Sequence, residues 1–217
     1  MKTLNPSKDT GWNLDNIRFL HPPDDFTGTF ANEKMQQRHE EMQQVKIMEI
    51  LARLTNENDP AAAMRILNPL EHVKFVINNL EQFKQAGLLE PTVLELYYRG
   101  NTPFVTSGDY DTWKMLLLRC DRELLARQGG TPPVAKLTGY RGSVTGIARG
   151  HSWTVDKNEV QWILNRWADK SLGGGTVFAI EVTVQDILVY LENEDRKEFI
   201  LDPEKMAGLT PVEITRI

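Results

Sequence analysis

The chain has 217 residues, of which 25% are charged and 41% are hydrophobic. These values are typical of one folded domain or two small ones, and they exclude both a large modular protein and an intrinsically disordered chain. The formal net charge of −5 at pH 7 argues against a broad basic surface for nucleic acid or anionic lipid. Nucleic acid is therefore not the expected partner.

Cysteine content and hydropathy indicate the cellular compartment of the protein. Cys120 is the single cysteine, which excludes an intramolecular disulfide and a multi-cysteine zinc cage and favours a reducing compartment. Residues 1–30 lack the apolar region of a secretory signal. No later stretch reaches the roughly 18 apolar residues of a membrane span. We expect a cytoplasmic protein with no membrane segment.

The N-terminal part of the chain predicts helices. Residues 1–30 mix Gly, Pro and Asp with isolated aromatic residues, which we expect to anchor an irregular segment. Residues 31–56 predict an amphipathic helix, residues 69–86 a second helix that ends at Gly87, and residues 91–100 a shorter one. The apolar stripe of the first helix contains Met35, Met42, Val45, Met48 and Leu51.

The pattern changes in the second half. A helix is predicted from Gly108-Asp109 to Gln128, with Trp113, Leu117, Cys120 and Leu124 on one face. The Gly and Pro residues that follow, at 129–133, mark the clearest internal boundary. Beyond it, residues 177–184, 199–201 and 212–217 predict strands, and residues 158–169 predict a helix. We predict an α+β fold in which an N-terminal helical region, residues 1–134, packs on a small sheet core, residues 135–217.

Several common chemistries are excluded by their missing motifs. The chain has no Gly-x-x-x-x-Gly-Lys-Ser/Thr loop, no His-Glu-x-x-His helix and no Gly-x-Ser-x-Gly turn, which excludes P-loop, zincin and serine-hydrolase sites. The four histidines are scattered without ligand spacing. No metal site is predicted.

One stretch carries candidate site residues. Tyr140-Arg141-Gly142 and Gly150-His151-Ser152-Trp153-Thr154 predict a strand, a loop and a second strand before the helix at 158–169. Arg141 offers a fork of donors for phosphate or ribose, and Gly142 lets a ligand approach the backbone. The Ser152 and Thr154 hydroxyls share one side of a strand. Glu198 begins a later strand, where its carboxylate could face a developing positive charge.

In this order the motifs resemble the Arg–Ser–Glu class of mono-ADP-ribosyltransferases, especially the small enzymes of phages and prophages. The resemblance covers residues 137–217 and none of residues 1–134. It implies a split β-sheet with a cleft for NAD, the co-substrate. Arg141 would hold phosphate and ribose, Ser152 would support the catalytic glutamate, and Glu198 would be that glutamate. The other expected contacts with NAD are Tyr140, Gly142, Trp153, Thr154 and Phe178, with Trp153 standing where the family commonly has threonine.

The chemistry of NAD cleavage favours a site with these residue types. Cleavage of the N-glycosidic bond of NAD builds positive charge on the ribose, so a preorganised carboxylate stabilises the transition state more than the ground state. An aromatic face would also favour the cationic nicotinamide ring. Tyr140, Trp153, Phe178 and Tyr190 are the candidates for that contact, and a core position is the alternative for each.

Alternatives remain open for the acceptor of ADP-ribose and for the identity of the catalytic carboxylate. Enzymes of this class that modify arginine carry a second glutamate two residues before the catalytic one, where this chain has Arg196. Arginine is therefore not the expected acceptor, which leaves Asn, Gln, Thr, a nucleobase or water. Glu192, Glu194 and Asp195 are alternative site carboxylates, although such a charged run is usually a solvated turn. We prefer Glu198 to Glu194.

We predict a transferase that carries ADP-ribose from NAD to a host protein, acting as an effector in the host cytoplasm if a phage encodes it. An NAD glycohydrolase is the nearest alternative. The other is a non-enzymatic phage inhibitor that binds a partner through the methionine stripe, which is otherwise a core-facing stripe. Tyr98-Arg99-Gly100 repeats the tripeptide of residues 140–142 but ends a predicted helix, which indicates a structural role.

Overall fold

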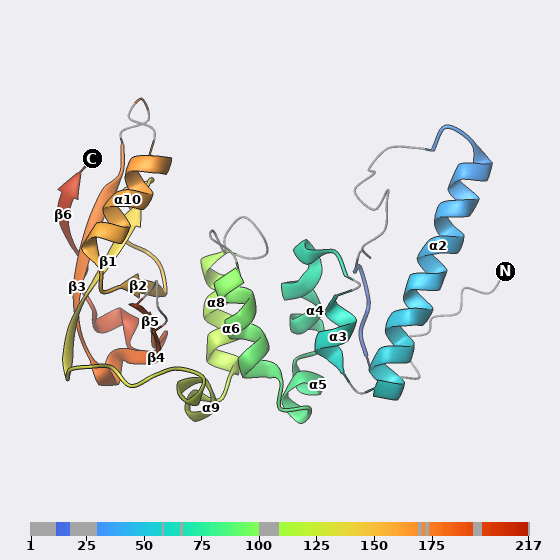
Figure 1. Ribbon diagram of the computed structural model, residues 1–217, viewed down its shortest axis with the longest axis horizontal. Helices are drawn as coiled ribbons and strands as arrows, with labels where there is room; N and C mark the ends of the chain where they lie inside the picture. The colour runs from blue at the N-terminus through green and yellow to red at the C-terminus, as the bar shows by residue number, and fades with distance from the viewer. Residues whose placement is uncertain are drawn as a thin grey trace. The chain divides into compact units, whose positions relative to one another are not determined.

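The computed structural model describes residues 12–17, 30–57, 59–65, 67–99, 109–168, 171, 174–192 and 197–216. The chain divides into two compact units, Met1–Asp109 and Tyr110–Ile217 (Figure 1). The first is helical, and the second contains helices and an antiparallel sheet. The division falls before the helices of residues 110–127, whereas the sequence suggested a boundary after residue 134.

The helices of the first unit are short after a long initial one. They are α2 (Glu33–Ala52), which continues into the π-helical turn η1 (Arg53–Glu57), then α3 (Pro60–Met64), η2 (Pro69–Glu71), α4 (His72–Asn78), α5 (Leu80–Gln85) and α6 (Leu89–Arg99). The Asn32 side chain accepts a hydrogen bond from the Met35 main-chain N–H at 2.9 Å and so caps the start of α2. Among the described residues, no helix combines the length and the apolarity that crossing a membrane requires.

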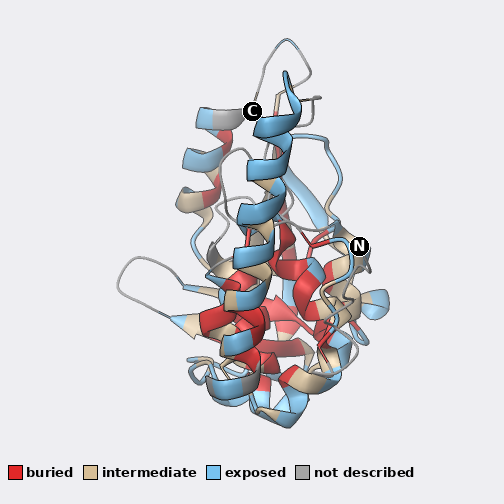
Figure 2. Cartoon of the chain, turned by 90° about the vertical axis from the view of Figure 1, so that its right-hand side faces the viewer, coloured by how far each residue is buried: buried red, intermediate tan, exposed pale blue. Residues whose placement is uncertain are grey.

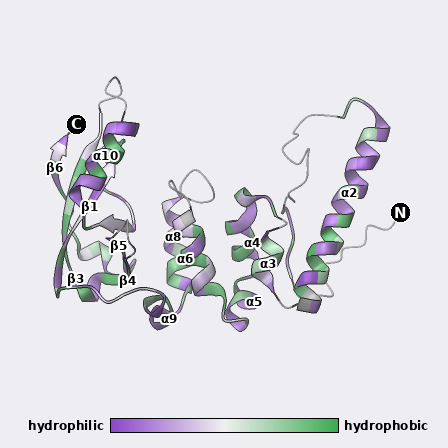
Figure 3. Ribbon diagram, in the orientation of Figure 1, coloured by the Kyte–Doolittle hydropathy of each residue, from purple (hydrophilic) through white to green (hydrophobic). Residues whose placement is uncertain are grey.

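The predicted helix over residues 31–56 is confirmed, but most of its apolar stripe is not part of the core. Met35, Met42 and Met48 are 52, 40 and 63% exposed. Figure 2 shows the long helix α2 exposed along most of its length, and Figure 3 shows hydrophobic residues interspersed among its hydrophilic ones. Burial is concentrated near the end of α2, at Ile50 and Leu51. The core-facing alternative is therefore wrong for the three methionines and holds for Leu51.

The single helix predicted over residues 69–86 is divided at Asn79, which is fully buried. The Asn79 amide donates to the carbonyl oxygens of Phe75 and Asn13, both at 2.8 Å, and its oxygen accepts from the Asn13 N–H at 2.6 Å. Trp12 is buried beside this contact, with its ring stacked on Phe75 at 6.0 Å and edge-on to Phe83 at 6.1 Å. The predicted aromatic anchoring is confirmed for Trp12.

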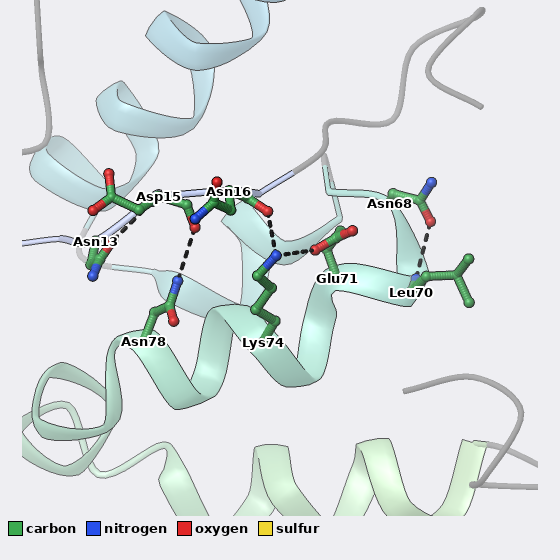
Figure 4. Close-up of polar contacts among 8 residues, drawn as sticks. All are labelled: Asn13, Asp15, Asn16, Asn68, Leu70, Glu71, Lys74 and Asn78. Atoms are coloured by element: carbon green, nitrogen blue, oxygen red, sulfur yellow. Dashed lines mark hydrogen bonds and ion pairs between the residues drawn. The ribbon is translucent and has the colours of Figure 1, made fainter. Parts of the chain in front are cut away.

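Helix α4 also holds the N-terminal segment through its polar side (Figure 4). Lys74 donates to the Asn16 carbonyl oxygen at 2.6 Å and forms an ion pair with Glu71 at 3.5 Å. Asn78 donates to the Asp15 carbonyl oxygen at 3.2 Å. Residues 12–17 are thus fixed to the helical unit. Of the other aromatic residues in 1–30, Phe30 packs against the His39 ring of α2 at 5.0 Å, and Phe19 and Phe26 lie outside the described residues.

The second unit holds a curled six-stranded sheet, with the strand order β4-β5-β2-β1-β3-β6 and antiparallel pairing throughout. Its elements are α8 (Tyr110–Arg119), α9 (Arg122–Arg127), β1 (Lys136–Ser143), β2 (Ser152–Thr154), α10 (Lys157–Trp167), β3 (Thr176–Thr183), η4 (Val184–Asp186), β4 (Ile187–Glu192), β5 (Lys197–Leu201), η5 (Met206–Gly208) and β6 (Val212–Arg216). The predicted mixture of helix and sheet is confirmed, and β4 was not predicted.

Two predicted details of this unit are wrong. The helix expected over residues 108–128 is interrupted at Asp121, whose carboxylate accepts the Glu123 and Leu124 N–H groups and caps α9. The rotation at this break leaves Leu124 42% exposed and buries Leu125 instead. In the strand expected over residues 177–184, Val184 instead begins η4 and is exposed.

The sheet has an apolar layer on each face. On one face Trp153, Phe178 and Phe199 belong to the main core cluster. On the other, Val160 and Leu164 of α10 pack against Val177 of β3. Adjacent strand residues point to opposite faces, so every residue of β1, β2 and β5 is assigned to one layer or the other.

Helix α9 and the connection after it are attached to the same sheet. Arg122 forms an ion pair with the buried Asp202 and also donates to the Gln185 carbonyl oxygen at 3.2 Å. The Gly130 N–H donates to the Tyr190 carbonyl oxygen at 2.7 Å. These contacts attach α9 and the connection after it to the strands of the second unit.

Candidate functional site

Pairing of β2 with β5 brings together two residues that are 46 positions apart in the sequence, Ser152 and Glu198. Thr154 is the register partner of Glu198, and Ser152 is the partner of Ile200, so all four side chains leave the same face of the sheet. The Ser152 hydroxyl donates to Glu198 Oε2 at 3.3 Å. Both residues retain intermediate exposure, so a hydroxyl-supported carboxylate is accessible at this sheet position.

Arg141 lies on β1, next to β2 in the sheet. Its Nη1 donates to the carbonyl oxygen of Ser152 at 2.8 Å. The guanidinium rests against the backbone of Gly150, where an added Cβ would overlap three guanidinium atoms. Gly150 is therefore needed for this close approach, a requirement that the sequence did not reveal.

Strand alternation places the Arg141 side chain and the Ser152–Glu198 pair on opposite faces. Tyr140 is the register partner of Thr154 and shares its face, so Arg141 leaves β1 on the other side, beside its partner Phe178. The structure thus joins Arg141 to Ser152 through the main chain. It places Glu198 next to the Ser152 side chain.

The Thr154 hydroxyl makes hydrogen bonds that have a structural role. Its hydroxyl lies 2.9 Å from Glu159 Oε2 and 3.0 Å from the Lys197 carbonyl oxygen, and it accepts the Asp156 N–H at 3.1 Å. Thr154 is 7% exposed. These bonds fix the turn between β2 and α10, and Glu159 is a member of the site region that the sequence reasoning missed.

Tyr140 and Gly142 face helix α10. Tyr140 packs against the Val160 and Leu164 cluster while keeping partial exposure. A Cβ on Gly142 would lie 2.9 Å from Leu164 Cγ and 3.1 Å from a Val160 methyl group. Glycine at 142 therefore makes room for the helix, a packing role in place of the expected approach of a ligand.

The other aromatic candidates are core residues. Trp153, Phe178 and Tyr190 are 1, 8 and 2% exposed and belong to the main core cluster. The Trp153 indole N–H donates to the Gly150 carbonyl oxygen at 3.2 Å. Tyr140 is thus the one of the four candidates that combines partial exposure with the face of Glu198.

His151 is a buried neutral base beside the site. Its ring stacks on Tyr110 with centroids 4.3 Å apart, and Nε2 lies 3.2 Å from the Tyr110 carbonyl oxygen. Burial lowers the His151 pKa to about 4, the contact with the Tyr110 carbonyl opposes this, and the positive charges of Arg141, Lys114 and Arg149 lower it further. Nε2 therefore carries the single proton at neutral pH.

The alternative carboxylates and the repeated tripeptide are only partly described. Glu192 forms an ion pair with Lys197 at 2.7 Å, and this contact raises the pKa of Lys197. Glu194, Asp195 and Arg196 lie outside the described residues. Helix α6 ends at Arg99, as predicted for Tyr98-Arg99-Gly100, and Gly100 is also outside. Within the described ranges no cluster of His, Cys, Asp and Glu could hold a metal ion.

No protein-family model, curated protein or solved structure matches this chain. The functional inference therefore rests on the residues, their order along the chain and the geometry described above.

Proposed function

We propose that the protein is an NAD-dependent mono-ADP-ribosyltransferase. One observation carries the proposal: the Ser152 hydroxyl supports the Glu198 carboxylate across β2 and β5, while Arg141 from the adjacent β1 binds the main chain of Ser152. These are the three residues in which the chain resembles the Arg–Ser–Glu class.

In the proposed reaction the bond between nicotinamide and ribose breaks, and its electron pair leaves with nicotinamide. Positive charge builds on the ribose carbon and is stabilised by the Glu198 carboxylate. The acceptor then forms a bond to that carbon and loses a proton. Ser152 positions the carboxylate through its hydroxyl. In this proposal Tyr140, a partly exposed aromatic residue on the same face, contacts the nicotinamide ring.

The test uses labelled NAD, the purified full-length protein and a bacterial lysate. Glu198→Gln should lower both nicotinamide release and labelling by about 10²–10³-fold, since it removes the charge that faces the ribose. Glu181→Gln is the matched control: Glu181 is an exposed strand carboxylate that accepts the Thr138 hydroxyl at 2.6 Å in the same sheet. It should keep full activity.

Two outcomes would reject this proposal. One is equal labelling by wild type and Glu198→Gln, and the other is neither labelling nor nicotinamide release from protein shown to be folded. Nicotinamide release without any labelled acceptor would instead assign the NAD glycohydrolase activity.

A second candidate is favoured by a different observation. The exposed stripe of Met35, Met42 and Met48 on α2 is the kind of flexible apolar surface that adapts to a protein partner. In a purely binding protein, mass spectrometry of the lysate would show no added mass of ADP-ribose. Loss of partner capture with Met42→Glu would then support this binding function.

A further inference from the structure

The second unit contains a cavity of about 360 Å³. Behind it lie the buried Trp153 of β2, Ile180 of β3 and Leu201 of β5, all members of the main core cluster. The partly exposed apolar residues of its lining include Met206, Leu209 and Pro211. The Ser152 and Glu198 side chains leave the other face of these strands. The cavity is therefore separated by the sheet from the Ser152–Glu198 pair.

One wall of the cavity is aromatic and cationic. Tyr110 and Lys114, one turn apart on α8, line it together with Arg149 from the β1–β2 connection. The Arg149 guanidinium lies 4.0 Å from the centre of the Tyr110 ring, and His151 stacks on the same ring at 4.3 Å. Because the Arg149 guanidinium and the His151 ring both lie so close to the centre of the Tyr110 ring, they must occupy opposite faces of that ring.

The charge at this wall is positive. Arg149 is paired with Asp111 at 2.7 Å, and Lys114 has no salt bridge with any described residue. Arg141 is a third cation whose charge, like those of Lys114 and Arg149, acts on His151, and His151 itself is neutral. At the wall itself the two cations Lys114 and Arg149 face one carboxylate, Asp111, although the whole chain has a net charge of −5. An anion is the ligand that complements this wall.

We propose that this cavity binds a small organic anion with a planar apolar body, such as a nucleoside monophosphate or an aromatic carboxylate. The anionic group contacts Lys114 and Arg149, and the apolar body lies against Met206, Leu209 and Pro211, which are partly exposed residues of the lining. The volume is within the range of small-molecule pockets, about 300–1,000 Å³. The inference does not depend on the transferase activity.

The experiment titrates the ¹⁵N-labelled full-length protein with AMP and with 2-naphthoate. The indole N–H of Trp153 is the reporter, because this side chain lines the cavity. The indole of Trp162, which is 60% exposed on α10, is the internal control. A saturable shift of the Trp153 resonance without a matching shift of Trp162 is expected. Adenosine, the uncharged counterpart of AMP, should bind at least about tenfold more weakly.

Three variants locate the site. Lys114→Gln should weaken binding by about tenfold, whereas Lys157→Gln on α10 should leave it unchanged. Ala207→Trp places a large side chain at an exposed position of the cavity lining and should abolish the Trp153 shift.

Any of three results would overturn the proposal: neither anion shifts Trp153, adenosine binds as tightly as AMP, or Lys157→Gln weakens binding as much as Lys114→Gln. Because the readout is binding, these results are independent of whether NAD is cleaved.

Discussion

At the residue scale, two positions of the candidate site require glycine, and the physical reason differs between them. Gly142 leaves room for Leu164 and Val160 of α10, whereas Gly150 leaves room for the guanidinium of Arg141. Both appear in the sequence as glycines near a motif. What each one contacts depends on which face of which strand it occupies, and this is decided by strand pairing.

Gly150→Ala tests the placement of Arg141. The new methyl group would overlap the end of a flexible side chain, so Arg141 should move while the fold is kept. We expect little change in thermal unfolding and a fall of about tenfold or more in kcat/KM for NAD, because Arg141 holds the Ser152 main chain and Ser152 in turn positions the Glu198 carboxylate. Steady-state nicotinamide release measures this. Unchanged kinetics would show that Arg141 does not need its present position.

The neutral state of His151 should make folding depend on pH. The His151 pKa is about 4 in the folded protein, against 6.5 for ordinary histidine, so between these pH values only the unfolded chain takes up the proton. The free energy of unfolding should therefore rise with pH across this window and be lost on acidification, by on the order of 3 kcal/mol.

Urea denaturation at pH 5 and pH 7 measures this effect, with His151→Phe as the comparison. Phenylalanine preserves a ring beside Tyr110 but binds no proton. The variant should show a smaller difference between the two pH values than wild type. Equal differences would mean that His151 does not carry the pH dependence.

At the element scale, Asn79 shows how a tertiary contact interrupts a helical pattern. The spacing of Val73, Val76 and Phe83 continues through residues 69–86, so periodicity alone predicts one helix. The break is stabilised by bonds from Asn79 to Asn13, 66 positions away. A contact at that separation leaves no local signal in the sequence.

Asn79→Ala removes three hydrogen bonds of a buried side chain. We expect a loss of about 2–3 kcal/mol in the free energy of unfolding of the first unit, measured by chemical denaturation followed by circular dichroism. Asn78→Ala is the matched control, since it removes one partly exposed bond at 3.2 Å, and should cost less than about 1 kcal/mol. Equal effects of the two variants would contradict the role of Asn79.

Helix α9 is the opposite case, because its start does have a local signal. Asp121 is a good N-cap residue followed by Glu123 in the first turn. This cap indicates that the helix predicted over residues 108–128 is divided at Asp121. The division places Leu125, not Leu124, in the core.

At the scale of the whole molecule, the division after Asp109 makes the sheet unit a candidate for independent folding. A fragment of residues 110–217 keeps the main core cluster, α8 and the Arg122–Asp202 ion pair. We expect it to unfold cooperatively in denaturant and to release nicotinamide from NAD. A fragment of residues 135–217, which lacks α8 and α9, should be less stable and provides the comparison. Failure of the longer fragment to fold would show that residues 1–109 are required for its stability.

The sequence by itself determined the elements with local signals: the long helix near residues 31–56, the helix near 158–169, the strands near 177–184, 199–201 and 212–217, and the mixed fold class. Hydrophobic period and capping residues act over a few positions, so they can be read directly. The exposure of the methionine stripe, the break at Asn79 and the faces of Arg141 and Gly142 were decided by the tertiary structure. So was the contact of Ser152 with Glu198, because strand pairing and side-chain burial depend on residues far apart in the chain.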